Sequence, residues 1–266
     1  MQRPIANPVL KYYGGKFRLA RWVISHFPRH ESYVEPFGGG GSVLFQKEPS
    51  RLETYNDLDG DVCNFFRVLR DRADELVRSI RLTPWSREEF EVCLTAAEDP
   101  LEQARRLFFR LKMSMHGGTR AIASNFRRHK SRDSPVAGIK PQVIYDAAKR
   151  LSLVQIENRD AARLIADMDS PSTLFYLDPP YVTATRTDKN RYTHELDDDA
   201  HRRLAATLDG VKGMVVLSGY ASDLYRSLFE DRGWRRVDTE TTANGGVKRR
   251  ESLWLSPRTL AALDCG

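Results

Sequence analysis

The stretch Ser32-Tyr33-Val34-Glu35-Pro36-Phe37-Gly38-Gly39-Gly40-Gly41-Ser42 indicates the fold of this chain. Its first residues read as a short β-strand that ends at a proline, and its glycines predict a tight turn. The apolar residues 43–45 then predict the start of a helix. Residues 52–55 predict a second strand that ends in Asn56-Asp57, and residues 62–69 predict a helix with one apolar face. A strand, turn, helix, strand and helix in this order begin a doubly wound α/β sheet.

Strand and helix patterns alternate again toward the C-terminal end. Residues 154–156 read as a strand, and residues 173–177 and 214–217 are continuous apolar runs, which are typical of central parallel strands. Asp197-Asp198-Asp199 predicts the cap of a helix that continues through Leu208. Two further runs predict an antiparallel pair that closes the sheet, at residues 234–239 and 252–255.

The middle of the chain differs from both ends. Residues 71–115 read as helix, residues 116–140 are rich in Gly, Ser and Arg without periodicity, and a helix follows at residues 142–151. We therefore predict one α/β domain in two sequence pieces, residues 1–70 and 151–266. A helical, basic insert at residues 71–150 separates the two pieces.

Composition excludes several classes of protein. The chain has 266 residues, of which 41% are hydrophobic, and this is enough for a buried core. No apolar run approaches the ~20 residues that span a bilayer, and Met1-Gln2-Arg3-Pro4 is not an apolar signal segment. Three scattered cysteines, Cys63, Cys93 and Cys265, do not suggest disulfides or a zinc site, and the six histidines form no metal-binding motif. We expect a soluble, cytoplasmic protein without a metal.

The positive charge is concentrated in one segment. The whole chain carries a net charge of +6, but residues 101–150 alone carry +9, so the other residues carry −3. Such a block is the electrostatic pattern expected for a polyanionic partner such as DNA. A solvated helix face with surplus Lys and Arg is the alternative interpretation.

The glycine turn and Asp57 together indicate a cofactor that contains adenosine. Glycines between a first strand and a first helix let a ligand approach the backbone closely. Asp57, at the end of the second strand, is placed to accept hydrogen bonds from ribose hydroxyls. The turn is not a Walker loop for nucleoside triphosphates, because no Gly-Lys-Ser/Thr follows it. The pattern alone does not distinguish a dinucleotide from S-adenosylmethionine.

Leu177-Asp178-Pro179-Pro180-Tyr181 resolves that choice. The two prolines hold the Asp178 carboxylate and the neighbouring carbonyls rigid at the end of a buried strand. Asp178 and the Pro179 carbonyl can accept both N–H hydrogens of an exocyclic amine, while the Tyr181 ring stacks on the base. A purely structural Pro-Pro turn is the alternative.

On these motifs the chain resembles the Dam-like, alpha-group adenine-specific DNA methyltransferases over nearly its whole length. The matching segments are Leu10-Lys11-Tyr12-Tyr13-Gly14-Gly15-Lys16, Glu35-Pro36-Phe37-x-Gly-x-Gly, Asn56-Asp57, Asp178-Pro179-Pro180-Tyr181 and Glu251-Ser252-Leu253-Trp254-Leu255. Asp160 resembles a further acid near the cofactor adenine. The order of the motifs around a central insert is that of the alpha group.

The resemblance implies a Rossmann-like methyltransferase sheet that binds S-adenosylmethionine, with a helical target-recognition insert. It implies cofactor contacts from Tyr12, Lys16, Glu35, Phe37, Gly39, Asp57, Asp160 and Asp178. The implied catalytic residues are Asp178, Pro179, Pro180 and Tyr181. The candidates for DNA contact are Lys11, Arg120, Arg127, Arg128, Lys130 and Arg132.

The activity that we expect is site-specific methylation of adenine N6, on a base that is flipped out of duplex DNA. The enzyme would act, most simply as a monomer, on DNA in the cytoplasm of a bacterial or phage-infected cell. It could belong to a restriction-modification pair or be a solitary methylase.

The resemblance does not extend to the target sequence. Members that read GATC carry an Asn/Tyr/Arg-rich hairpin where this chain has residues 113–120, and Tyr220 resembles the variant of phage-type members. Three alternatives stay open at this point: methylation of cytosine N4, methylation of RNA or protein glutamine, and a DNA-binding protein with a vestigial cofactor pocket. The motif order and the basic insert argue against the second.

Overall fold

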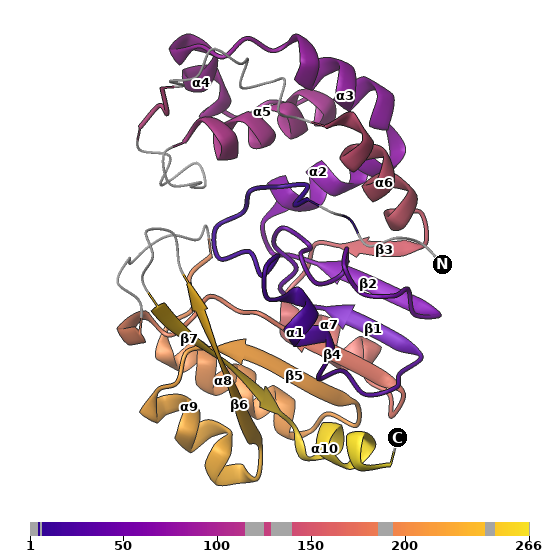
Figure 1. The fold of residues 1–266 in the computed structure, drawn as a ribbon, viewed down its shortest axis with the longest axis vertical. Coiled ribbons are helices and arrows are strands. Elements are labelled where there is room, and N and C mark those ends of the chain that lie inside the picture. The colour runs from indigo at the N-terminus through magenta and orange to yellow at the C-terminus, as the bar shows by residue number, and fades with distance from the viewer. Residues whose placement is uncertain are drawn as a thin grey trace.

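The computed structural model describes residues 5, 7–114, 125–128, 140–185, 194–242 and 248–265. These residues form a seven-stranded sheet in the order β3-β2-β1-β4-β5-β7-β6 (Figure 1). The strands are β1 (Ser32–Glu35), β2 (Leu52–Asn56), β3 (Val154–Glu157), β4 (Thr173–Leu177), β5 (Met214–Gly219), β6 (Arg235–Thr242) and β7 (Lys248–Leu255). Neighbours from β3 to β5 run parallel, and β7 runs antiparallel to β5 and β6. The predicted α/β class and the closing antiparallel pair are confirmed.

The described helices lie on both faces of the sheet and beyond one edge of it. They are α1 (Ala20–Ile24), α2 (Gly60–Asp71), α3 (Ala73–Leu82), α4 (Arg87–Cys93), α5 (Pro100–Met113), α6 (Pro141–Leu151), α7 (Ala161–Met168), α8 (Asp198–Asp209), α9 (Asp223–Leu228) and α10 (Pro257–Asp264). Short 3-10 turns occur at Thr183–Thr185 and Glu230–Arg232. Within the described ranges, no helix is long and apolar enough to cross a membrane.

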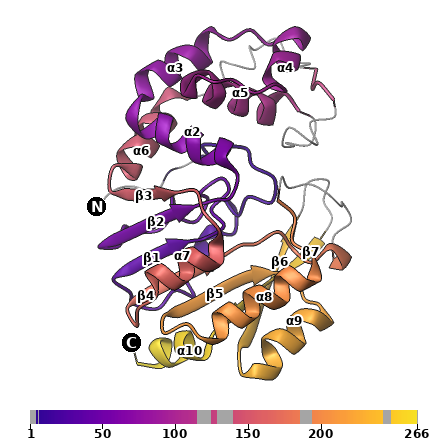
Figure 2. The ribbon, with the colours of Figure 1, turned by 180° about the vertical axis from the view of Figure 1, so that it is seen from behind.

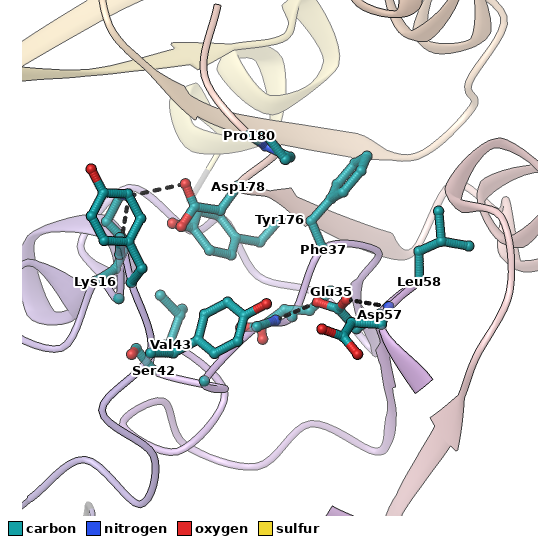
Figure 3. A pocket seen from close by; sticks show the side chains of 18 of the residues that line it. Lys16, Glu35, Phe37, Ser42, Val43, Asp57, Leu58, Tyr176, Asp178 and Pro180 are labelled. Atoms are coloured by element: carbon teal, nitrogen blue, oxygen red, sulfur yellow. Dashed lines mark hydrogen bonds and ion pairs between the residues drawn. The ribbon is translucent and has the colours of Figure 1, made fainter. Parts of the chain in front are cut away.

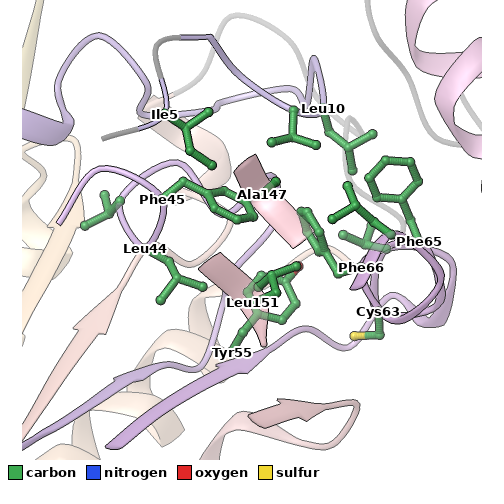
Figure 4. Close-up of a cluster of buried hydrophobic side chains, with 14 of the residues drawn as sticks. Ile5, Leu10, Leu44, Phe45, Tyr55, Cys63, Phe65, Phe66, Ala147 and Leu151 are labelled. Atoms are coloured by element: carbon green, nitrogen blue, oxygen red, sulfur yellow. The ribbon is translucent and has the colours of Figure 1, made fainter. Parts of the chain in front are cut away.

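Alternation along each strand divides the core between the two faces. On β1, Tyr33 belongs to one apolar cluster and Val34 to the other. Figure 2 shows α7 and α8 in front of one face, where side chains such as Leu164 and Leu208 cover the strands. The opposite face is covered by α1, α2, α10 and the turn that contains Phe45, and Figure 4 shows part of this cluster.

The cluster that contains Tyr33 and Phe45 extends without interruption from the sheet into the helices of the middle of the chain. Phe66 on α2 packs edge-on against Tyr55 of β2, with 5.0 Å between ring centroids. Phe65, one residue earlier, stacks on Phe108 of α5 at 6.3 Å. Ala147 of α6 belongs to the same cluster. The helices α3 to α6 therefore share a core with the sheet, and the division of the chain at residues 70 and 150 stays a prediction.

Part of the basic block neutralises acids inside the protein. Four arginines of residues 101–150 form ion pairs in the described structure: Arg105 with Glu89 and Glu102, Arg106 with Glu102, Arg110 with Asp61, and Arg150 with Glu53. Three of these acids, Glu53, Asp61 and Glu89, lie outside the segment. The local sum of +9 therefore overstates the positive charge that remains for a partner.

Several predicted elements differ in detail from the structure. Residues 43–45 form consecutive turns and not a regular helix, although Phe45 N–H donates to the Gly41 carbonyl. The helix that we predicted over residues 71–115 is divided, within the described residues 73–114, into the three helices α3, α4 and α5. The last of them ends at Met113, because Ser114 is extended and bridges to Phe126. The helices α7, α9 and α10 were not predicted.

Candidate active site

A pocket opens at the carboxyl ends of β1, β2 and β4 (Figure 3). This is the edge where open parallel sheets bind ligands, since the turns after neighbouring strands meet there. Its lining includes eight of the predicted site residues: Tyr12, Lys16, Glu35, Phe37, Gly39, Asp57, Asp178 and Pro180. Segments that are far apart in the sequence therefore meet in one site.

The glycine turn is held in place by the residues that end β2. The Gly39 N–H donates to Asp57 Oδ2 at 2.8 Å, and the Tyr55 hydroxyl donates to the Gly39 carbonyl at 2.6 Å. Gly39 and Gly41 have φ values of 48° and 64°, which side chains other than glycine rarely adopt. A Cβ at Gly38 would lie 2.2 Å from the Tyr55 ring, so glycine is required there for space. Asp57 thus shapes the loop as well as facing the pocket.

Two acids in the pocket, Glu35 and Asp57, bind protons more tightly than usual. Burial raises the pKa of Glu35 to about 8, although a hydrogen bond from the Tyr33 hydroxyl at 2.5 Å opposes the shift. Burial also raises the pKa of Asp57 to about 6, against the backbone N–H groups of Asp59 and Gly39. A positive charge near either carboxyl would favour its ionised form.

Lys16 joins the N-terminal turn to the proline-rich turn after β4. Its Nζ lies 3.0 Å from Asp178 Oδ1, donates to the Gly14 carbonyl at 3.1 Å and sits 4.6 Å from the centre of the Tyr181 ring. Lys16 is only 7% exposed, so this pair is largely shielded from solvent. Lys16, Asp178 and Tyr181 form one charged and aromatic unit at the carboxyl end of β4.

Not every predicted cofactor residue lies on the pocket. Asp160 is exposed and caps α7 by accepting the Arg163 N–H at 3.1 Å, and it is not among the lining residues. Pro179 and Tyr181 are also absent from the lining, although Tyr181 lies beside Lys16.

The structure adds lining residues that sequence reasoning missed. Tyr176 belongs to β4 and could have been found from its position two residues before Asp178. His194 and Leu196 come from the segment before α8 and carry no motif that would have marked them. The charge of His194 also acts on Asp57, which places the two side chains near each other.

A group of cations lies beside the pocket. Lys11 directly precedes the lining residue Tyr12, and its pKa is lowered by burial and by the charge of Arg127. Lys112 on α5 has its pKa lowered by burial and by the charge of Lys11. Within the part that the structure describes, these three side chains form no ion pair with an acid. Arg128 is also described and exposed, whereas Arg120, Lys130 and Arg132 lie outside the described residues.

Among the described residues, no group of three or more His, Cys, Asp or Glu side chains could hold a metal ion. The residues that line the pocket include acids, a lysine and aromatic rings.

Comparison with known families matches residues 12–243 to the family described as D12 class N6 adenine-specific DNA methyltransferase. The chain belongs to this family. Members of the D12 class transfer a methyl group to adenine N6 in DNA, so this chain is a DNA adenine methyltransferase. The match includes the glycine turn, Asp57 and the Asp178–Tyr181 turn, and it confirms the resemblance on which the sequence-based prediction depended.

Individual relatives of this D12 chain are similar over most of its length. It is 26% identical to a DNA adenine methylase of Escherichia coli (strain K12), over 91% of each chain. It is 25% identical to the Type II methyltransferase M1.LlaDCHI of Lactococcus lactis subsp. cremoris, over 91% of this chain and 90% of that protein. It is 24% identical to a DNA N-6-adenine-methyltransferase of Escherichia phage P1, over 85% of this chain and 31% of that protein. The family supports an enzyme acting on adenine over a cytosine-N4 methylase or a non-catalytic protein.

Proposed function

We propose that this chain transfers the methyl group of S-adenosylmethionine to N6 of an adenine that has left the stack of duplex DNA. The observation that carries the proposal is the position of Asp178, which lies at the carboxyl end of β4 on the pocket that Asp57 and the glycine turn also line. The same pocket therefore holds a candidate acceptor for the N–H groups of an amine, Asp178, and a candidate acceptor for ribose hydroxyls, Asp57.

The lining residues fit the parts of this cofactor. Each oxygen of the Asp57 carboxylate accepts one backbone N–H, from Gly39 and Asp59 at 2.8 Å, and keeps capacity to accept a ribose hydroxyl. Lys16 supplies a cation for the amino-acid carboxylate, and Tyr12 and Phe37 supply aromatic surface. Glu35 is the buried acid in the same pocket. The cofactor supplies a methyl group on a positively charged sulfur.

Asp178 and the Pro179 carbonyl act on the nucleophile. The lone pair of an aromatic amine is delocalised into the ring, which makes adenine N6 a poor nucleophile. Accepting both N–H hydrogens draws N6 toward a tetrahedral shape and localises that pair. As the N–C bond forms and the S–C bond breaks, N6 becomes positive, and the Asp178 carboxylate stabilises this charge until a proton leaves N6. Tyr181 is the stacking surface for the base.

Purified enzyme tests this proposal directly. Incubation with unmethylated duplex DNA and S-adenosylmethionine labelled on the methyl group is expected to place label in DNA. Digestion of the DNA to nucleosides is expected to yield N6-methyl-2′-deoxyadenosine. Label recovered as N4-methyldeoxycytidine would contradict the choice of base, and DNA without label would contradict the activity.

We also propose that the cation group of Lys11, Lys112 and Arg127 holds phosphates of the DNA backbone. Positive charges that lie close together without a neighbouring acid repel one another, and a bound anion relieves this repulsion. Replacing all three by alanine is expected to weaken DNA binding and to reduce the slope of log K against log salt by about 2 to 3, since each lost phosphate contact removes about 0.9. Binding to labelled duplex, titrated at several salt concentrations, measures the slope.

A triple variant at the amino ends of the strands, opposite the pocket, is the control for this experiment. Arg29, Arg51 and Lys212 are exposed and lie before β1, β2 and β5, at the amino ends of these strands. Their replacement by alanine removes the same charge and is expected to leave the slope nearly unchanged. Equal slopes for the two triple variants would show that only net charge matters and would contradict the proposed contact surface.

A further inference from the structure

Glu251 of β7 is a buried acid that contacts Tyr181, in the proline-rich turn after β4. We propose that Glu251 is a positioning residue, which holds the Tyr181 ring in the orientation that receives the target base. This inference rests on the proposed function, because it assigns a partner to the tyrosine that stacks on the base. None of the sequence motifs assigned a role to this side chain.

The contacts of Glu251 come from the residues that follow two neighbouring strands, β4 and β5. The Tyr181 hydroxyl, just after β4, donates to Glu251 Oε2 at 3.0 Å. The antiparallel register pairs Gly219 of β5 with Ser252, so Tyr220 lies beside Glu251, and its hydroxyl favours the ionised form of the carboxylate. The two tyrosine rings meet edge to face, with 4.6 Å between centroids. Glu251 is 7% exposed and therefore anchors both rings from inside the protein.

A carboxylate at this buried position carries a desolvation cost. Burial raises the pKa of Glu251, and the charge of Asp178 acts in the same direction, whereas the charge of Lys16 and the two tyrosine hydroxyls favour ionisation. Lys16 is therefore shared, because it pairs with Asp178 at 3.0 Å and also compensates Glu251. A neutral acceptor would satisfy one hydroxyl at lower desolvation cost. The carboxylate instead accepts from Tyr181, lies beside Tyr220 and is near the charge of Lys16 in the pocket.

The consequence is that the Tyr181 ring is held at both ends. Pro179 and Pro180 restrict the backbone that carries the ring, and Glu251 fixes the hydroxyl at its tip. Lys16, over the ring, and Tyr220, at 4.6 Å between ring centroids, limit its remaining motion. A stacking surface that is rigid before the base arrives reduces the cost of aligning N6 with the methyl group.

The test is a double-mutant cycle on the full-length chain. The variants are Glu251→Gln, Tyr181→Phe and the combination of both, with Glu251→Ala as a stronger change. Tyr181→Phe keeps the ring and removes only the hydroxyl. Glu240→Gln is the matched control, because Glu240 is exposed on the neighbouring strand β6. We measure kcat on a duplex that the wild type methylates, the cofactor Kd without DNA, and the melting temperature.

Glu251→Gln is expected to lower kcat about tenfold while the cofactor Kd changes less than about threefold. In the Tyr181→Phe background the same change is expected to cost less than about twofold, because the contact through which it acts is already gone. Glu251→Ala is expected to lower kcat further, and Glu240→Gln to match the wild type. If Glu251→Ala does not fold, the near-isosteric Glu251→Gln still decides.

Three results would overturn the inference. Wild-type kcat for Glu251→Gln would show that the anchor is unnecessary. Losses that multiply in the double variant would show that Glu251 acts independently of Tyr181. A weakened cofactor Kd at unchanged kcat would place Glu251 in cofactor binding instead. In each case the wild type still methylates DNA, whereas a wild type without methyl transfer would contradict the proposed function itself.

Discussion

Replacing Asp178 by alanine is expected to lower kcat for methyl transfer by about 1,000-fold or more. Removal of one preorganised transition-state contact costs about 100- to 1,000-fold in other enzymes, and Asp178 is proposed both to activate N6 and to stabilise its positive charge. The variant also leaves Lys16, only 7% exposed, without the carboxylate that lies 3.0 Å from its Nζ. Single-turnover incorporation of label from S-adenosylmethionine into DNA measures the loss.

Two comparisons separate chemistry from folding in this experiment. Asp178→Asn preserves the shape of the side chain, so its melting temperature is expected to stay near that of the wild type while kcat remains strongly reduced. Asp167→Ala removes an acid that is exposed on α7 and paired with Arg159, and it is expected to keep full activity. Near-normal methylation by Asp178→Ala would refute the proposed activation of the amine.

Replacing Asp57 by alanine is expected to weaken cofactor binding by about 100-fold, which corresponds to about 2.7 kcal/mol. The variant loses an acceptor for the ribose and also the acceptor of the Gly39 N–H, so the glycine turn loses its anchor. Because the chemistry depends on Asp178, kcat at saturating cofactor is expected to fall much less than the affinity. Isothermal titration with S-adenosylmethionine measures Kd, and an unchanged Kd would exclude Asp57 from the cofactor site.

The pH dependence of cofactor binding provides an independent check on Asp57. Since burial raises its pKa to about 6, the wild-type carboxyl becomes protonated as pH falls through 6 and becomes a poorer acceptor. The wild-type Kd is therefore expected to rise between pH 7 and pH 5, and the Kd of Asp57→Asn to stay flat. Glu35, with a pKa of about 8, is mostly protonated throughout this range. His194→Gln is the control for the neighbouring imidazole, and it is expected to retain the dependence.

Sequence reasoning located the elements whose signals are local. The apolar run of β4, the glycine turn and the residues that end β2 each depend on near neighbours, and the structure brings them together as a parallel sheet requires. The predicted start of a helix at residues 43–45 was wrong, because three apolar residues after a glycine turn cannot show whether regular helix geometry follows. The short helices α7, α9 and α10 span too few residues for a strong periodic pattern.

Features that depend on distant partners could not be predicted. The arginines of residues 101–150 appeared available for DNA, but Arg110 pairs with Asp61, and Arg150 pairs with Glu53, which is far away in the sequence. His194 enters the pocket through tertiary placement alone. Glu251 lies in a segment that resembled only the last strand of the family, and its contact with Tyr181 exists only because β7 runs back along β5.

The continuous core between the sheet and α5 limits how the helical segment, which we predict to recognise the target, can diverge in this chain. The stacked pair Phe65 and Phe108 joins α2 to α5 at 6.3 Å, and α2 in turn packs on β2 through Phe66. The helical segment is therefore not an interchangeable module. Exchange of residues 71–150 for those of a relative with another target would break this packing unless α2 were exchanged too. If the helical segment recognises the target as we predict, a new DNA sequence preference can arise without loss of the fold only at its surface residues and at the connections between its helices.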